Sequence, residues 1–209
     1  MIASGLAPDA VIAYDSALLL QRPWKPDPKA LEVERLSFLT ATRPIRISSE
    51  DITYAPVRPA RALGSRWRNQ VATLERFGVS FSITALERTL VDLLDRIDLA
   101  PPPLELWEAF AFARPDADAM VVHALALDSA TAAARLGFFL ERLPYVAPQT
   151  LRRLEKLRPS SPTYFDRRDR DGRNAFLKRW NLVVPSLVAQ TVERTEFRRG
   201  SPTIPTLRD

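Results

Sequence analysis

The chain has 209 residues, enough for one large domain or two small ones, and 46% of them are hydrophobic, enough for a buried core. Without cysteine, the chain cannot form a disulfide framework, a thiol nucleophile or a cysteine-ligated metal site, and its single histidine, His123, excludes two imidazole ligands. The net charge of +5 resembles a nucleic-acid signal, but 26 of the 30 basic residues are arginine, a bias that GC-rich coding sequence also produces.

Short apolar and alternating stretches dominate the N-terminal part of the chain. Residues 16–20 predict a buried helix that ends before Pro23, and a proline-rich loop follows around Trp24. Residues 58–70 are rich in arginine. Strands are predicted where β-formers alternate or cluster between prolines and turn residues: Leu36–Leu39, Ile45–Ile47, Ile52–Tyr54 and Val79–Ile83.

The helix after this last strand has the clearest sequence signature. Thr84 followed by Glu87 matches a capping box, in which the hydroxyl accepts from the third helical N–H and the carboxylate reaches back. Leucines then recur at helical spacing on one face up to Ile97, and a triple proline follows. We expect Asp92 and Asp95 on the opposite, solvated face.

Helical patterns fill most of the remaining chain. They cover Leu104–Ala113, Ala117–Leu127, Ser129–Leu143 and Thr150–Leu157, and the apolar run Trp180–Val184 predicts a closing strand. The fold class is therefore α+β, with short N-terminal strands, a helical C-terminal half and a closing strand. We expect one domain over residues 1–190, with a subdivision near 83 into a strand-rich part (1–83) and a helical part (84–190), and a tail over 191–209.

Several classes of functional site are absent from the sequence. Six scattered glycines cannot form a phosphate-binding glycine loop, and neither a kinase glycine loop nor HRD and DFG motifs occur. His123 lies in an apolar stretch and is interpreted as a hydrogen-bonded structural residue. No catalytic residue is assigned, and no metal or cofactor is expected. No leader with a basic start and no apolar run of ~20 residues occurs, so we expect a cytoplasmic protein without membrane contact.

Positive charge is concentrated in residues 150–180, which hold ten basic and four acidic residues, a net charge of +6. A local excess of this kind suits an acidic protein surface, a nucleic acid or an unspecialised solvated face. The candidate partner-binding residues are Arg152, Arg153, Lys156, Arg158, Arg167, Arg168, Arg170 and Arg173.

Three stretches together resemble the AbiEi-type antitoxin family. Residues 83–94, ITALERTLVDLL, resemble its strand followed by an ERTLxDLL helix, and residues 134–141, ARLGFFLE, resemble its RLGFLLE-like helix. Residues 179–185, RWNLVVP, are similar to its closing strand, with Phe165 and Asp166 where the family often has Leu-Asp. The order and spacing agree, and the resemblance covers about residues 8–186.

This resemblance implies a C-terminal antitoxin domain whose partner is a polymerase-β-like nucleotidyltransferase toxin that modifies tRNA or related targets. The family usually places a promoter-binding winged helix before this domain. The chain starts directly at the domain, so we expect poor sequence-specific DNA binding. Within the motifs, Arg88 and Asp92 are four residues apart and can pair, and Gly137 predicts close packing of a neighbouring element.

Three functions therefore remain open. The first is an antitoxin that neutralises the nucleotidyltransferase toxin by direct binding and is not an enzyme. The second is an atypical protein kinase that phosphorylates a toxin serine, which would need ATP and Mg²⁺ and a carboxylate such as Asp166 or Asp169. The third is a nucleic-acid-binding transcriptional regulator that uses the basic residues of 150–180.

Overall fold

The computed structural model describes residues 7–22, 35–43, 52–76, 78–198 and 201–205. It divides into two compact units, residues 1–93 and 94–209, which are described separately. The division falls within one helix, α3 (Leu86–Asp95), later in the chain than the place near 83 where strands give way to helices. The sequence-based α+β class is confirmed, with strands in the N-terminal half and helices in the C-terminal half.

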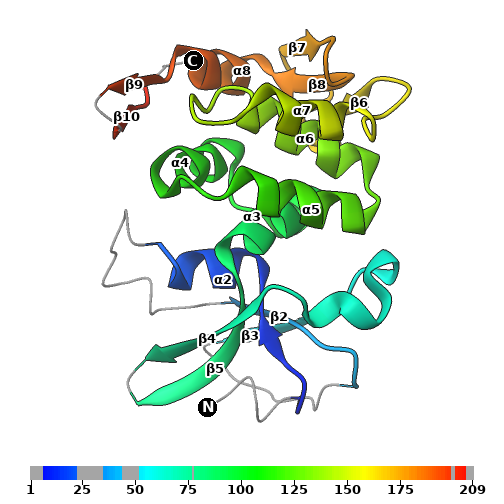
Figure 1. Cartoon of the computed structure of the whole chain (residues 1–209), viewed down its shortest axis with the longest axis vertical. Coiled ribbons are helices and arrows are strands. Elements are labelled where there is room, and N and C mark those ends of the chain that lie inside the picture. Colours follow the sequence, from blue (N-terminus) through cyan, green and yellow to red (C-terminus); the bar gives the residue numbers. More distant parts are fainter. Residues whose placement is uncertain (1–6, 23–34, 44–51, 77, 199–200, 206–209) are drawn as a thin grey trace. The chain divides into compact units, whose positions relative to one another are not determined.

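Unit 1 is built on a five-stranded mixed sheet of order β3-β2-β1-β5-β4 (Figure 1). Its strands are β1 (Val11–Ile12), β2 (Arg35–Leu39), β3 (Thr53–Val57), β4 (Val71–Arg76) and β5 (Val79–Thr84). The short central strand β1 pairs antiparallel with β2 and parallel with β5. Helix α2 (Tyr14–Leu20) and the 3₁₀ segment η2 (Arg61–Arg68) accompany the sheet, and α3 follows β5.

The core of unit 1 forms where α2 meets the sheet. Ile12, Ala17 and Ile83 pack together and are buried. The hydroxyl of Ser16 fixes the helix to β2, because it accepts from the Ser37 amide at 2.9 Å and donates to the Arg35 carbonyl at 3.1 Å. The predicted helix over residues 16–20 is thus present, and it begins slightly earlier than the sequence pattern indicated.

Three of the four predicted N-terminal strands overlap β2, β3 and β5, and β3 begins one residue later and ends three residues later than predicted. The fourth, Ile45–Ile47, and the loop around Trp24 lie outside the described residues. Strand β4 was not predicted from the sequence. Arg76 pairs with Val79, so β4 and β5 are joined by a two-residue turn in which Gly78 has a φ of 70°, as short hairpin turns favour.

Unit 2 begins at the end of α3 and is mostly helical (Figure 1). Its helices are α4 (Pro103–Ala113), α5 (Ala117–Leu127), α6 (Ala130–Leu140), α7 (Pro148–Glu155) and α8 (Ser186–Arg194), with 3₁₀ segments η3 (Ile97–Leu99) and η4 (Arg167–Asp169). Strands β6 (Thr163–Tyr164), β7 (Asn174–Leu177) and β8 (Leu182–Pro185) form a sheet of order β6-β8-β7. A hairpin of β9 (Glu196–Arg198) and β10 (Ser201–Thr203) follows α8.

The core of unit 2 is aromatic. Trp107, Phe110, Phe139 and Phe165 are fully buried, and the ring centroids of Phe139 and Phe110 are 5.1 Å apart. The predicted helices agree with α4 to α7 within a few residues, and the predicted closing strand overlaps β8. Secondary structure continues past residue 190 through α8 and the β9–β10 hairpin, which the sequence patterns did not predict. Every helix in the described part of the chain falls short of the length and apolarity needed for a membrane span.

Candidate functional site

The charged residues Arg88 and Asp92 of the ERTLVDLL segment on α3 are buried inside unit 1. Arg88 is 1% exposed, and its Nε donates to Asp92 Oδ2 at 3.1 Å. Its Nη1 donates to the carbonyls of Trp67 and Asn69, each at 2.7 Å. The expected pairing of Arg88 and Asp92 is confirmed, but the expectation that Asp92 lies on a solvated face is wrong, because its partner draws it into a buried position. This arginine fixes α3 to the segment before β4.

Two threonines connect β5 to the start of α3. The hydroxyls of Thr84 and Thr89 lie 2.7 Å apart, and both residues are fully buried. Thr89 also donates to the Thr84 carbonyl at 3.1 Å and to the Ala85 carbonyl at 2.9 Å. Thr84 was singled out as a cap; α3 begins at Leu86, two residues later, and the Thr84 hydroxyl contacts Thr89 at the strand-to-helix turn.

The ARLGFFLE and RWNLVVP segments meet in unit 2 at a glycine. A Cβ on Gly137 would lie 2.3 Å from the ring of Trp180, so only glycine leaves room for this ring against α6. Trp180 is fully buried, and its Nε1 donates to Glu141 at 2.9 Å, one helical turn beyond the glycine. The expected close approach of another element to Gly137 is confirmed, and that element is the turn before β8.

Arg135, two residues before Gly137, is a buried charge. Its Nη1 donates to the Leu94 carbonyl at 2.6 Å, and its guanidinium carbon lies 5.8 Å from the centroid of the Phe165 ring. Burial lowers the pKa of Arg135 to about 10, although the charges of Asp166 and Asp95 act in the opposite direction. Its Nε has no partner among the described residues. The arginine therefore crosslinks α6, the end of α3 and β6.

Asp166, considered above as a metal-holding carboxylate, organises the start of η4. It is 8% exposed and accepts from the amide of Arg168 at 2.9 Å and from the Arg168 Nε at 2.8 Å. Burial raises the pKa of Asp166, but the hydrogen bonds and charge of Arg168, together with the charge of Arg135, hold it below its ordinary value. Its carboxylate is thus engaged by arginine and by the backbone, a structural role.

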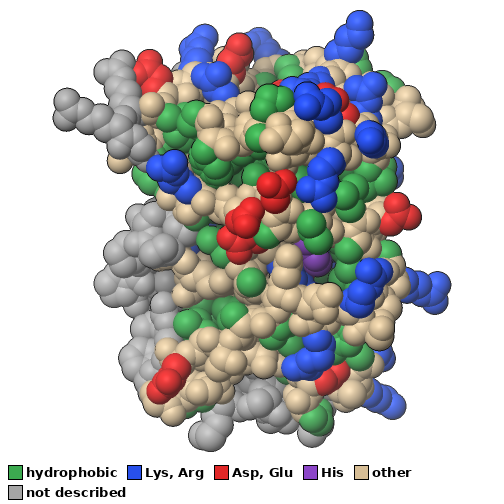
Figure 2. All heavy atoms as spheres, in the orientation of Figure 1, with side chains coloured by type: hydrophobic (Ala, Val, Ile, Leu, Met, Phe, Trp, Pro, Cys, Tyr) green, Lys and Arg blue, Asp and Glu red, His purple; other side chains and the backbone are tan. Residues whose placement is uncertain are grey.

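The eight candidate partner-binding residues are all exposed, and they lie in two groups. The first is on and after α7 and comprises Arg152, Arg153, Lys156 and Arg158; the second is on and after η4 and comprises Arg167, Arg168, Arg170 and Arg173. Figure 2 shows Lys and Arg side chains over the part of unit 2 that holds α7 and the β6-β8-β7 sheet. The basic residues that are close together in the sequence are thus divided between two structural elements, α7 and η4.

Part of this charge is already paired. Arg168 binds Asp166, and Arg153 lies 3.4 Å from Asp118 with both side chains largely exposed. Arg158 donates to the Arg179 carbonyl, which connects the end of α7 to the turn between β7 and β8. Within the described part of the chain, the charged side chains of five cations in residues 150–180 have no hydrogen-bond or ion-pair partner: Arg152, Lys156, Arg167, Arg173 and Lys178. These are the charges that a partner can recruit.

The sheet between these groups presents an apolar row that sequence reasoning missed. In the register, Val183 of β8 is opposite Tyr164 of β6 and opposite Phe176 of β7. Residues opposite one another share a face of a sheet, so the three side chains form one row across the three strands. Phe176 is 53% exposed and Tyr164 is 36% exposed. Leu182, Val183 and Val184 are all apolar, so no alternation in the sequence marked Val183 as the outward residue.

A pocket of about 410 Å³ opens on the other side of the sheet, between α6, α8 and β7. Three of its charged lining residues, Glu141, Arg142 and Arg179, have partners within the protein. Glu141 accepts from Arg179 and Trp180, and Arg142 donates to the carbonyls of Val192 and Thr195. These groups stabilise the packing around Trp180, so we assign the pocket no ligand. His123, the single histidine, is 5% exposed on α5, as a structural residue would be.

Comparison with known proteins gives a likeness of fold. No family model matches the chain, and no curated protein matches it. The crystal structure of the Rv2827c protein from Mycobacterium tuberculosis matches with a TM-score of 0.51 and 17% sequence identity. The match covers 88% of this chain and 65% of the Rv2827c chain, so this chain spans less than two thirds of its neighbour.

Proposed function

We propose that this chain is an antitoxin that neutralises a nucleotidyltransferase toxin by binding to it. The proposal starts from the three segments that resemble the AbiEi-type hallmarks in order and spacing. The observation that carries it furthest is the contact of Gly137 with Trp180, since these residues come from two of the three segments. The Trp180 ring is what requires glycine at position 137, and a substitution at either position would disturb the other. This dependence between two of the family-like segments supports a fold shared with that family.

Binding agrees better than catalysis with the way the charged residues are used. The motif residues Arg88, Asp92 and Arg135 are buried and hold secondary-structure elements together. Asp166, the carboxylate that a kinase mechanism would recruit for Mg²⁺, is engaged by Arg168. The unpaired cations, in contrast, are exposed on unit 2, where an acidic partner can reach them. As part of such a pair, the protein would act in the cytoplasm.

The test uses the purified chain and the nucleotidyltransferase encoded beside its gene. The two proteins should form a complex, and the chain should inhibit nucleotide transfer in proportion to the complex formed, with or without ATP. Intact-mass measurement of the toxin after incubation with ATP and Mg²⁺ separates the alternatives. An unchanged toxin mass together with inhibition supports binding, whereas addition of a phosphoryl group would replace this proposal by the kinase.

A further inference from the structure

The outer face of the β6-β8-β7 sheet combines an apolar row with free positive charge. The row consists of Tyr164, Val183 and Phe176, and we call these three residues the aromatic row. Neighbouring strands are ~4.8 Å apart, so the two aromatic residues are separated by roughly 10 Å with valine between them. Exposed aromatic side chains at the ends of a continuous apolar strip are typical of the buried centre of a protein interface.

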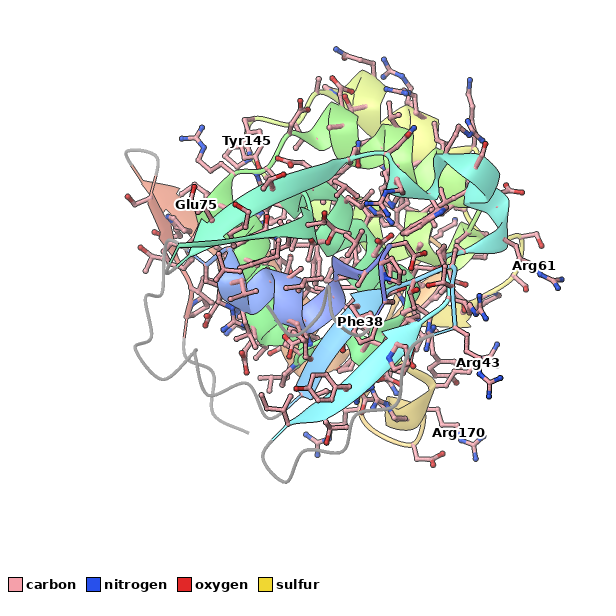
Figure 3. All side chains as sticks on the ribbon, turned by 90° about the horizontal axis from the view of Figure 1, so that it is seen from below. Phe38, Arg43, Arg61, Glu75, Tyr145 and Arg170 are labelled. Carbon is pink, nitrogen blue, oxygen red and sulfur yellow. The ribbon has the colours of Figure 1, made fainter. Side chains whose placement is uncertain are left out.

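Basic residues stand at both ends of strand β7, the strand that carries Phe176 of the row. Arg173 immediately precedes the strand and Lys178 immediately follows it, and neither side chain has a hydrogen-bond or ion-pair partner in the described parts of the chain. Arg170 belongs to the same loop as Arg173, and its side chain extends away from the ribbon (Figure 3). The aromatic row is therefore bordered by cations that remain available to an incoming acidic surface.

We infer that the aromatic row and its basic border form the docking surface for an acidic protein partner that places an apolar side chain against Phe176. This inference rests on the proposed function, in which that partner is the toxin. The apolar contact supplies the interaction that must break on dissociation, and Arg173 and Lys178 accelerate the encounter. The surface differs from the sequence-based expectation, because its centre is the sheet and not α7.

Charge and geometry favour a protein over a nucleic acid on this face. Asp169 and Asp171 are exposed within the same arginine-containing loop, and the side chain of Asp171 is 89% exposed. A phosphate backbone would meet these like charges, whereas a protein surface can pair with both signs. The valine between the two aromatic rings also suits an aliphatic side chain better than a base, since nucleic-acid platforms stack successive bases on aromatic rings.

The central experiment compares two substitutions of equally exposed apolar residues in unit 2. Phe176 in the aromatic row and Val122 on α5 are both 53% exposed. Phe176→Ser should weaken toxin binding at least ~30-fold, the effect of losing a central interface residue, mainly through faster dissociation. Val122→Ser should leave the affinity unchanged. Both variants should retain the wild-type melting temperature, which excludes unfolding as the cause.

A second pair of measurements tests the basic border. Arg173→Glu with Lys178→Glu should slow association at low salt, and the difference should shrink at high salt. Toxin binding that is equal for Phe176→Ser and wild type would overturn the inference but leave the proposed function standing. Failure of the wild-type chain to bind the toxin would remove the proposed function and, with it, this partner for the surface.

Two further outcomes would assign the face to another occupant. Fluorescence anisotropy with a single-stranded oligonucleotide of mixed sequence tests nucleic acid, and sedimentation of the chain alone tests a second copy. If Phe176→Ser abolished oligonucleotide binding or dissociated a dimer while toxin binding stayed intact, the inference would be overturned. Loss of toxin binding alone, with no change in either control measurement, supports it.

Discussion

The two faces of the β6-β8-β7 sheet use the same strands in opposite ways. On the inner face, Leu182 and Val184 are fully buried, and Trp180 in the turn before β8 packs on Gly137. On the outer face, Val183 is partly exposed between two exposed aromatic residues. Since successive residues of a strand point to opposite faces, a single strand serves both the core and the surface.

This contrast separates residues that specify the fold from residues available for function. Two of the three segments that resemble the antitoxin family meet at the inner face, and their fit is so close that one added methyl group at Gly137 would overlap the Trp180 ring. The outer face has no such constraint, because its side chains end in solvent. A substitution should therefore affect stability on the inner face and partner binding on the outer face.

The largest expected effect comes from breaking the inner face. Trp180→Ala should lower the free energy of unfolding by about 3–5 kcal/mol, because it leaves a large cavity beside α6. Phe176→Ala, an aromatic truncation on the outer face of the neighbouring strand, should change it by no more than ~0.5 kcal/mol. Urea denaturation of both variants measures the difference. Equal destabilisation would show that the two faces are not distinct in the way described.

A smaller loss of stability is expected when a methyl group is added at the contact between Gly137 and Trp180. Gly137→Ala should destabilise the protein by about 1–3 kcal/mol, because the new methyl group meets a rigid buried ring, even though alanine is the better helix former. The Trp180→Ala background provides the control, since there the space is open and Gly137→Ala should be neutral or stabilising. A double-mutant cycle measures this coupling. Additive effects of the two substitutions would show that the contact with Trp180 is not what requires glycine at position 137.

The sequence predicted helices well where local signals define their ends. Helix α5 was predicted with its observed bounds, Ala117–Leu127. Asp116 caps it by accepting from the amides of Asp118 and Ala119, and Asp128 ends it with a φ of 51°. Helix α7 begins before the predicted residue because Pro148 is in its first turn, where the missing N–H costs nothing.

Features set by pairing between distant segments were not predictable. Strands β6 and β7 are short, and their register with β8 joins residues far apart in the sequence. The aromatic row depends entirely on this register, so no local pattern reveals it. The same holds for the charged residues: sequence identified eight exposed cations, but not that Arg168 pairs with Asp166 while Arg173 and Lys178 border the row.

An intermediate effect on stability is expected for Asp166, which lies two residues beyond the end of strand β6. Its pKa is lowered in the folded protein, so its contribution to stability is complete above the unfolded value of about 3.9 and is lost as the pH falls through the folded value. Asp166→Asn should cost ~1 kcal/mol at neutral pH, the typical effect of losing a cap, and should flatten the acid limb of the stability profile. Asp171→Asn, in the same loop but exposed, should do neither. An unchanged acid limb in Asp166→Asn would contradict the assigned role.

The smallest effect on stability, together with a slower association with the toxin, is expected for substitutions on the exposed face of α7. Arg152→Glu, Arg153→Glu and Lys156→Glu together should leave folding intact, because Leu151 and Leu154 form the buried face of this helix. The triple variant should slow toxin association at low salt by about 10-fold, since charges outside the interface centre act on the encounter. The deficit should shrink as added salt reduces the Debye length to ~8 Å or less.

The matched control reverses the same number of charges elsewhere: Arg43→Glu, Arg61→Glu and Arg66→Glu, all at exposed positions in unit 1. Arg43 and Arg61 extend into solvent in Figure 3. If net charge alone governed the encounter, both triple variants would slow association equally. We expect the α7 variant to be slower, because its charge belongs to the unit that carries the aromatic row. Stopped-flow association at two salt concentrations distinguishes these outcomes, and a wild-type rate for the α7 variant at low salt would assign that helix a solvated face without a role in binding.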